Sequence, residues 1–181
     1  TYGAGKVGNG AIYDGVDDYH NGGNILNLGT NDRFISFWVK PFSLTGMFGL
    51  ITKSNDNINT RFHISTYLGT TYFTIKNIGI TIATTELNVN QWNYITWNIN
   101  RLGNMVVKYN NIIKGTADIS SLAGHNIVSA TPFRIGALTQ IDNVRPTYFF
   151  NGIIDEVLIY NKFMNDTDEK RIYCNLHPLN G

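Results

Sequence analysis

Short apolar runs recur along the chain at intervals of about ten residues, separated by clusters of Gly, Asn and Asp. Within many runs hydrophobic and polar residues alternate, and β-branched and aromatic residues predominate. This pattern is typical of β-strands, and its even spacing favours a β-sandwich or jelly roll over alternating strands and helices. Clear strands are predicted over 34–40, 49–53, 61–67, 72–75, 94–99, 105–109, 133–135 and 153–160, and weaker ones over 11–13, 19–22, 78–82 and 112–115.

A helix signal occurs only near the end of the sequence. Asn165 is a suitable N-cap, and Asp168 stands three residues later, where a capping-box partner belongs. We therefore predict one short helix over 166–174, ended by Pro178 at the latest. Because no linker or repeat divides the chain, residues 1–181 are expected to form a single all-β domain with this helix at its C-terminal end.

The charge balance removes several classes of partner. The chain has 14 Lys and Arg against 13 Asp and Glu, a formal net charge of +1. This balance provides no basic stripe for nucleic acid and no polybasic membrane anchor. No apolar run approaches the roughly 20 residues of a membrane span, so membrane insertion is not expected. The single cysteine, Cys174, rules out an internal disulfide.

Six segments, in this order and spacing, resemble laminin-G-like, concanavalin A-like jelly-roll modules. They are "GAGKVGNGAIYDGVDDYH" (3–20), "FISFWVKPF" (34–42), "LNVNQWNYITWNINR" (87–101), "MVVKYNN" (105–111), "FRIGAL" (133–138) and "FNGIIDEVLIYNKFMNDTDEKRIY" (150–173). Tyr13 and Asn93 depart from the family pattern, which usually has Phe and often has His at these places. The resemblance implies two antiparallel sheets packed face to face, with the first and last segments adjacent.

The last of these segments places two carboxylates in a hydrophobic strand. Strict alternation puts Asp155 on the same face as Val157 and Ile159, so it is expected to face the core, where a charge needs a partner. The adjacency implied by the family brings Asp155 near Asp14. Two interpretations remain open: one structural calcium ion bound by both carboxylates, or hydrogen bonds from nearby backbone N–H groups.

Catalytic chemistry is not indicated. Glycoside hydrolases of similar fold need two carboxyl groups that face one cleft. Asp155 and Glu156 are adjacent and so point to opposite faces of a regular strand. The motifs of serine hydrolases and zinc peptidases are absent, and the histidines are scattered. We therefore predict a protein that is not an enzyme.

The β-sandwich modules that this sequence resembles mostly bind ligands, and carbohydrates are the commonest class of ligand among them. Sugars are recognised by aromatic faces flanked by polar side chains. Alternation directs Trp38, Arg61, His63 and Tyr94 away from the core. If their strands share a sheet, these four residues form a patch for one or two sugar residues. The alternative is that Trp38 and Tyr94 are covered and form a second small core.

Loops provide a further set of candidates: Tyr67 and Tyr72, and Arg145, Tyr148 and Phe149 in a long connection. Two functions follow from the sequence. The first is a non-catalytic carbohydrate-binding module of a larger extracellular, cell-surface or virion protein, whose partners are a glycan or polysaccharide and other domains of the parent chain. The alternative is a structural, adhesion or protein-interaction module without a small ligand.

Overall fold

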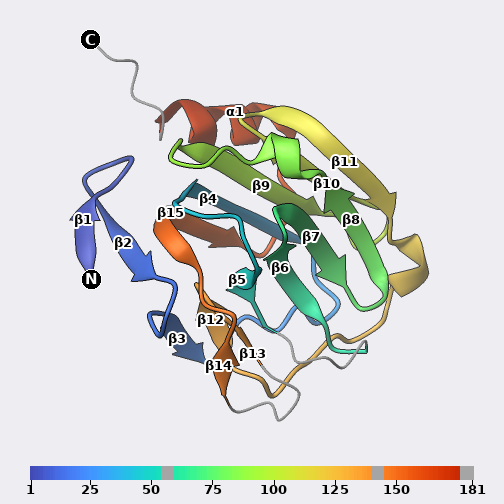
Figure 1. Cartoon of the computed structure of the whole chain (residues 1–181). Coiled ribbons are helices and arrows are strands. Elements are labelled where there is room, and N and C mark those ends of the chain that lie inside the picture. Colours follow the sequence, from blue (N-terminus) through green and yellow to red (C-terminus); the bar gives the residue numbers. More distant parts are fainter. Residues whose placement is uncertain (54–58, 140–144, 176–181) are drawn as a thin grey trace.

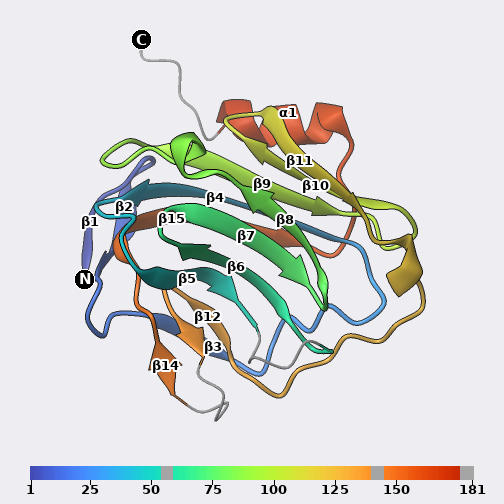
Figure 2. The same ribbon diagram turned by 45° about the vertical axis from the view of Figure 1, so that its right-hand side comes forward.

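The computed structural model describes residues 1–53, 59–139 and 145–175. Its strands form two main antiparallel sheets that pack face to face, as the sequence and the family resemblance predicted (Figures 1 and 2). The seven-stranded sheet contains, in spatial order, β1 (Tyr2–Ala4), β2 (Asn9–Asp14), β15 (Asn151–Tyr160), β4 (Arg33–Pro41), β9 (Asn93–Ile99), β10 (Asn104–Tyr109) and β11 (Ile112–Asp118).

The second main sheet is six-stranded. Its spatial order is β3 (His20–Gly23), β12 (Phe133–Ile135), β5 (Met47–Thr52), β6 (Phe62–Tyr67), β7 (Thr70–Ile75) and β8 (Ile78–Ile82). A small ribbon pairs β13 (Leu138–Thr139) with β14 (Pro146–Thr147), and two 3-10 turns span Thr84–Glu86 and Ser120–Leu122. Every predicted strand overlaps an observed one, whereas β1, β13 and β14 are too short to leave an alternating pattern.

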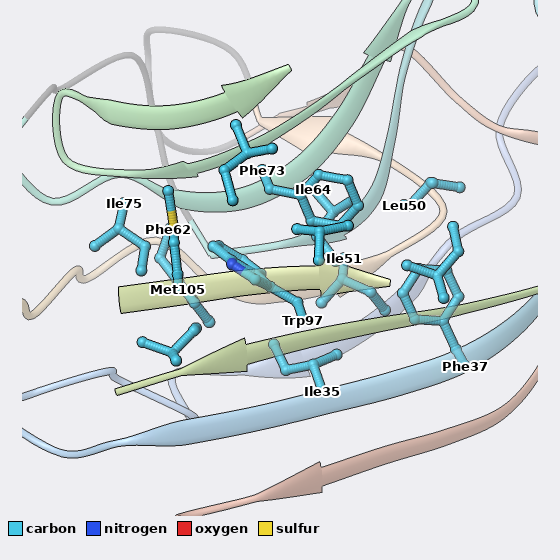
Figure 3. Close-up of a cluster of buried hydrophobic side chains, with 14 of the residues drawn as sticks. Ile35, Phe37, Leu50, Ile51, Phe62, Ile64, Phe73, Ile75, Trp97 and Met105 are labelled. Carbon is cyan, nitrogen blue, oxygen red and sulfur yellow. The ribbon is translucent and has the colours of Figure 1, made fainter. Parts of the chain in front are cut away.

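The core fills the space between the sheets with alternate residues of facing strands. Ile35 and Phe37 of β4 and Trp97 of β9 point inward and are fully buried, as their alternation predicted. The indole of Trp97 stacks on Phe62 with ring centroids 5.0 Å apart and meets the edge of Phe73 at 5.7 Å (Figure 3). Aromatic contacts across the two layers therefore join β9 to β6 and β7.

The predicted adjacency of the first and last segments is confirmed. β15 lies between β2 and β4 in the seven-stranded sheet and pairs antiparallel with both. Gly152 of β15 lies opposite Tyr13 of β2, so the family's opening and closing motifs are hydrogen-bonded neighbours.

A β-bulge in β15 changes the expected direction of Asp155. Ile154 lies opposite Val39 on the core side, and Ile159 lies opposite Ile35, also on the core side. The register shifts between Asp155 and Leu158, where Glu156 has a φ of 50°. The extra residue interrupts the alternation, so Asp155 lies opposite the outward-facing Trp38 and not with the core residues. The prediction that Asp155 shares a face with Ile159 was wrong for this reason.

The C-terminal helix α1 (Asp166–Asn175) lies on the outer face of the seven-stranded sheet (Figure 2). Its predicted N-cap is confirmed, because the Asp168 backbone N–H donates to Asn165 Oδ1 over 2.9 Å and Asn165 Nδ2 donates to Asp168 Oδ2 over 3.1 Å. None of the described helices has the length and apolarity needed to cross a bilayer.

Candidate functional site

The four residues expected to form one patch lie on two different sheets. Trp38 and Tyr94 belong to β4 and β9 of the seven-stranded sheet, whereas Arg61 and His63 belong to the β6 region of the six-stranded sheet. The two pairs therefore face opposite sides of the sandwich. The assumption of a shared sheet was wrong, because alternation assigns a side chain to a face of its strand without saying which sheet the strand joins.

Trp38 and Tyr94 form a small second core beneath α1. Their exposed fractions are 2% and 1%, and their ring centroids lie 5.0 Å apart. Tyr173 of α1 stacks on Trp38 at 6.1 Å and contacts Tyr94 at 5.3 Å. The Lys6 ammonium, from the turn between β1 and β2, lies 4.9 Å from the indole centroid. These contacts close both rings to a ligand.

The same turn supplies the partners of Asp155. Its carboxylate is buried, and Oδ2 accepts hydrogen bonds from the backbone N–H groups of Lys6 at 2.7 Å and Val7 at 3.0 Å. Oδ1 accepts a third bond from the N–H of Glu156 at 2.9 Å. A side chain at Gly5 would collide with Asp155 Oδ2, so glycine is required there for the turn to approach the carboxylate.

Asp14 is exposed and hydrogen-bonds within its own turn. Its Oδ1 accepts backbone N–H bonds from Val16 at 2.8 Å and Asp17 at 3.3 Å. These bonds, the one from Val16 above all, hold the pKa of Asp14 below its ordinary value. Asp14 lies opposite Asn151, four residues before Asp155 along β15, which corresponds to about 13 Å of strand.

This geometry does not fit a calcium ion shared by Asp14 and Asp155. The two carboxylates are separated along the sheet, and backbone N–H groups donate to oxygen atoms of both. Over 1–53, 59–139 and 145–175, no cluster of three or more His, Cys, Asp or Glu side chains is arranged to hold a metal. Calcium takes six to eight oxygen ligands around one point, so a site that used both carboxylates would need them close together.

A pocket of about 380 Å³ opens on the outer face of the six-stranded sheet. Alternate residues of β6 and the residue before it point to the same face, and β5 and β7 complete the lining. The described lining residues are Met47, Arg61, His63, Ser65, Tyr67, Tyr72 and Thr74. The pocket thus unites Arg61 and His63 from the predicted patch with Tyr67 and Tyr72 from the predicted loop candidates.

The strand register gives the pocket an aromatic end. Tyr67 lies opposite Met47 on β5, and Ser65 lies opposite Tyr72 on β7. Tyr67 and Met47 are 51% and 39% exposed, so a ligand can reach both side chains. Met47 was missed in the sequence because it lies outside the predicted 49–53 run, although it is an alternate position of the observed strand.

The opposite end of the pocket is polar. His63 lies opposite Thr74, and Arg61 precedes His63 by two residues on the same face. Burial and, to a lesser extent, the positive charge of Arg61 lower the pKa of His63 to about 3. The imidazole is therefore neutral near pH 7 and offers one N–H donor and one nitrogen acceptor.

The β13–β14 ribbon covers the neighbouring part of β5. The Thr52 hydroxyl donates to the Ala137 carbonyl over 2.8 Å, and the Gly49 N–H donates to the Tyr148 carbonyl over 3.1 Å. A side chain at Gly49 would collide with the Ala137 backbone, so this glycine permits the close contact. The ribbon therefore covers this part of β5 and leaves open the pocket that is lined by β6, β7 and Met47 at the start of β5.

The remaining loop candidates lie outside the described lining of the pocket. Arg145 and Tyr148 are exposed beside the ribbon, and Phe149 packs against Tyr19 with ring centroids 6.2 Å apart. The structure thus brings together only part of the set that the loop analysis proposed.

The sequence match decides the family. A model of the concanavalin A-like lectin/glucanase superfamily, of the laminin-G type, matches residues 14–168, which is most of the chain. This chain belongs to the concanavalin A-like lectin/glucanase superfamily. The resemblance seen in the sequence is thereby confirmed. No curated protein sequence matches this chain.

Solved structures of several other proteins share this fold. The binding domain of Paraclostridial Mosquitocidal Protein 1 aligns with 97% of this concanavalin A-like chain and 45% of its own chain, at a TM-score of 0.78 and 15% identity. Domain 4 of AbnA, an extracellular arabinanase from Geobacillus stearothermophilus, was solved in complex with arabinotriose. It aligns with 97% of this chain and 80% of its own chain, at a TM-score of 0.67 and 19% identity.

A third similar structure is the binding domain of botulinum neurotoxin DC in complex with rat synaptotagmin II. It aligns with 83% of this chain and 37% of its own chain, at a TM-score of 0.64 and 21% identity. The chain thus spans less than half of the two toxin domains and four fifths of the arabinanase domain. At these identities the likeness establishes the fold alone.

Proposed function

We propose that the chain is a non-catalytic carbohydrate-binding module that binds a glycan in the pocket over β5, β6 and β7. The observation that carries this proposal is the combination of aromatic rings, exposed at Tyr67 and half-buried at Tyr72, with hydrogen-bonding side chains in one pocket. The apolar face of a sugar ring packs on an aromatic side chain, and its hydroxyl groups need donors and acceptors nearby.

The two ends of the pocket suit these two requirements. Tyr67 and Tyr72 provide aromatic surface at one end, and Met47 adds an adaptable apolar contact. At the other end, His63 and Thr74 offer groups that both donate and accept hydrogen bonds. A sugar stacked at the aromatic end would therefore direct hydroxyl groups toward the polar end.

The size of the pocket supports a short glycan segment. Its volume of about 380 Å³ lies near the lower end of the roughly 300–1,000 Å³ common for small-molecule sites. One or two sugar rings suit this space, and the remainder of a polysaccharide would continue over the surface of the sheet.

The chemistry of the lining supports binding without hydrolysis. Glycoside hydrolysis commonly uses two carboxyl groups, one on each side of the scissile bond. The part of the pocket wall that the structure describes contains neither Asp nor Glu. Asp155 lies on the other sheet, where three backbone N–H groups bind its oxygen atoms.

The similar structures support a binding role and an extracellular setting. One of them is a domain of an extracellular enzyme in complex with arabinotriose, and others are binding domains of toxins. We infer that this chain is likewise a module of a larger extracellular, cell-surface or virion protein, and that it holds its parent protein at a glycan.

Tyrosine substitutions in the pocket test the proposal. Tyr67→Ala and Tyr72→Ala should each weaken binding to the preferred polysaccharide about tenfold or more, because each removes an aromatic contact surface. A glycan array identifies the preferred ligand, and affinity electrophoresis in gels containing that polysaccharide measures the loss. Thermal melting of each variant verifies that the fold is retained.

Tyr2→Ala is the matched control. Tyr2 is 68% exposed on β1, in the other sheet, so its removal should leave the affinity unchanged. Equal affinities of the Tyr67 and Tyr72 variants and the wild type would rule out this pocket as the glycan site. Absence of binding across a broad glycan array would instead favour a structural, adhesion or protein-interaction module.

A further inference from the structure

We infer that the pocket continues into an outer subsite, which binds further sugar rings of the same glycan chain. The outer subsite consists of Met47, Tyr67, Leu68 and Tyr148. The inference rests on the proposed function of the pocket and defines its ligand as an oligosaccharide longer than the pocket alone would hold. Its basis is an unfavourable backbone conformation at two exposed residues beside the pocket, Leu68 and Tyr148.

Leu68 occupies a turn position that does not favour leucine. Tyr67 pairs with Thr70, so Leu68 and Gly69 form a two-residue hairpin loop between β6 and β7. Their φ angles of 47° and 80° are both positive, as in a type I′ turn, whose first position favours Asn or Gly. The Leu68 side chain is 59% exposed, so little burial of apolar surface offsets the conformational cost.

Tyr148 has the same combination of features. Its φ is 52° and its side chain is 50% exposed. Among the residues that the structure describes, only Leu68 and Tyr148 join a positive φ to a large hydrophobic side chain that is at least half exposed. Backbone strain of this kind is concentrated at functional sites, where ligand contacts give it a purpose.

Both residues lie beside the aromatic end of the pocket. The β6–β7 hairpin and the start of β5 are at the same end of the six-stranded sheet (Figure 2). The Leu68 N–H donates to the Gly46 carbonyl over 2.8 Å, which places the hairpin loop next to Met47 of the pocket wall. The Tyr148 carbonyl accepts the N–H of Gly49, which is two residues, about 7 Å of strand, beyond Met47. Along β5, Met47 therefore lies between the contact points of the two strained residues.

The chemistry of the outer subsite suits a sugar ring. Tyr67 and Tyr148 each combine an aromatic face with a hydroxyl group, and Met47 and Leu68 add apolar contacts. A sugar ring presents the complementary combination of an apolar face and hydroxyl groups at its edge. Because Tyr67 and Met47 also line the pocket, a glycan chain that leaves the pocket at this end meets Leu68 and Tyr148 next.

Oligosaccharides of increasing length isolate the outer subsite. The probes are arabino-, xylo-, cello- and chito-oligosaccharides from the disaccharide to the hexasaccharide, with the same lengths from any other polysaccharide that the glycan array selects. A disaccharide fills only the pocket, whereas a hexasaccharide also reaches the outer subsite. The wild type should therefore bind the hexasaccharide about tenfold more tightly than the disaccharide, as measured by calorimetry.

Asparagine substitutions isolate the two strained residues. Leu68→Asn and Tyr148→Asn should each weaken binding of the hexasaccharide about 3- to 10-fold and leave the affinity for the disaccharide unchanged. Because asparagine accepts a left-handed backbone better than leucine, the melting temperature of Leu68→Asn should equal or exceed that of the wild type. Thermal melting also verifies that Tyr148→Asn folds.

Leu102→Asn is the matched control for the loss of an exposed leucine. Leu102 is 80% exposed in the turn between β9 and β10 of the other sheet, so its substitution should change neither affinity.

The outcomes separate this inference from the proposed function. If the wild type binds disaccharide and hexasaccharide equally, the outer subsite is overturned and glycan binding in the pocket stands. The same conclusion follows if Leu68→Asn and Tyr148→Asn bind the hexasaccharide as the wild type does while Tyr67→Ala loses binding, or if they weaken both lengths equally. A melting temperature of Leu68→Asn well below that of the wild type would contradict the strain on which the inference depends. If no glycan binds at all, both proposals are overturned.

Discussion

Asp155 shows how a carboxylate is accommodated between the sheet and a turn far away in sequence. Its two oxygens accept three backbone N–H bonds, two of them from the turn between β1 and β2. Without the carboxylate, these partly buried donors would lose their acceptor, which is unfavourable by up to about 1–3 kcal/mol for each group that water does not reach. Asp155 therefore fixes the N-terminal turn against β15.

Substitution of Asp155 should destabilise the protein more than substitution of Asp14. Asp155→Ala should lower the free energy of unfolding by about 3 kcal/mol, because its N–H donors lose their acceptors. Asp155→Asn, which keeps one carbonyl oxygen, should lose less. Asp14→Ala affects an exposed turn and should lose about 1 kcal/mol or less. Denaturant unfolding measures all three, and equal losses at the two positions would contradict this role of Asp155.

Much of the residue-level arrangement was predictable from the sequence. Alternation correctly directed Ile35, Phe37 and Trp97 into the core and His63 away from it. It failed at Asp155, because a β-bulge adds a residue that a two-residue period cannot reveal. A left-handed backbone at Glu156 depends on the surrounding sheet and has no glycine to mark it.

At the scale of elements, α1 is attached to the seven-stranded sheet by a buried polar cluster. Lys108 Nζ lies 2.8 Å from Glu169 Oε2 and 2.9 Å from Asp166 Oδ1. Asn98 donates to Glu169 Oε1 and to the Met164 carbonyl, and accepts a bond from the Met164 N–H. Burial alone would lower the pKa of Lys108, but the two carboxylates outweigh it and raise that pKa.

Glu169→Gln should therefore weaken the attachment of α1. The side chain of Glu169 is only 3% exposed, and its loss leaves Lys108 paired with Asp166 alone. Removal of one partner from a buried pair should lower the free energy of unfolding by about 2–4 kcal/mol. The comparison variant is Asp166→Asn, since that carboxylate is 81% exposed and should contribute less than about 1 kcal/mol. Similar losses for the two variants in denaturant unfolding would show that burial does not govern this cluster.

The assignment of strands to sheets marks the limit of element-level prediction. The sequence predicted the strands and the helix, yet it could not tell whether the strands of its candidate patch share a sheet. The patch of Trp38, Arg61, His63 and Tyr94 depended on that condition, which the structure does not meet. Each strand pattern records only which residues are buried, and both sheets bury one face against the same core. The sequence allowed for a cover over Trp38 and Tyr94, but it did not identify α1 as that cover, because this depends on the direction in which the helix returns.

For the whole molecule, the hydrogen bonds of Asp14 and Asp155 predict that stability does not depend on calcium. A ligand at 100 times its dissociation constant stabilises the folded state by about 2.7 kcal/mol, which would shift the melting temperature of a protein of this size by several degrees. We expect coincident melting curves with millimolar calcium and with excess chelator. A higher melting temperature with calcium, abolished in Asp14→Asn or Asp155→Asn, would restore the calcium hypothesis.

The position of β15 between β2 and β4 has a consequence for biosynthesis. The Lys6–Asp155 bond joins positions 149 residues apart, so the seven-stranded sheet cannot be completed while Asp155 is still inside the ribosome. Contacts of such long range also slow the search for the native state. During synthesis, β2 and β4 are therefore without their shared neighbour until β15 has left the ribosome.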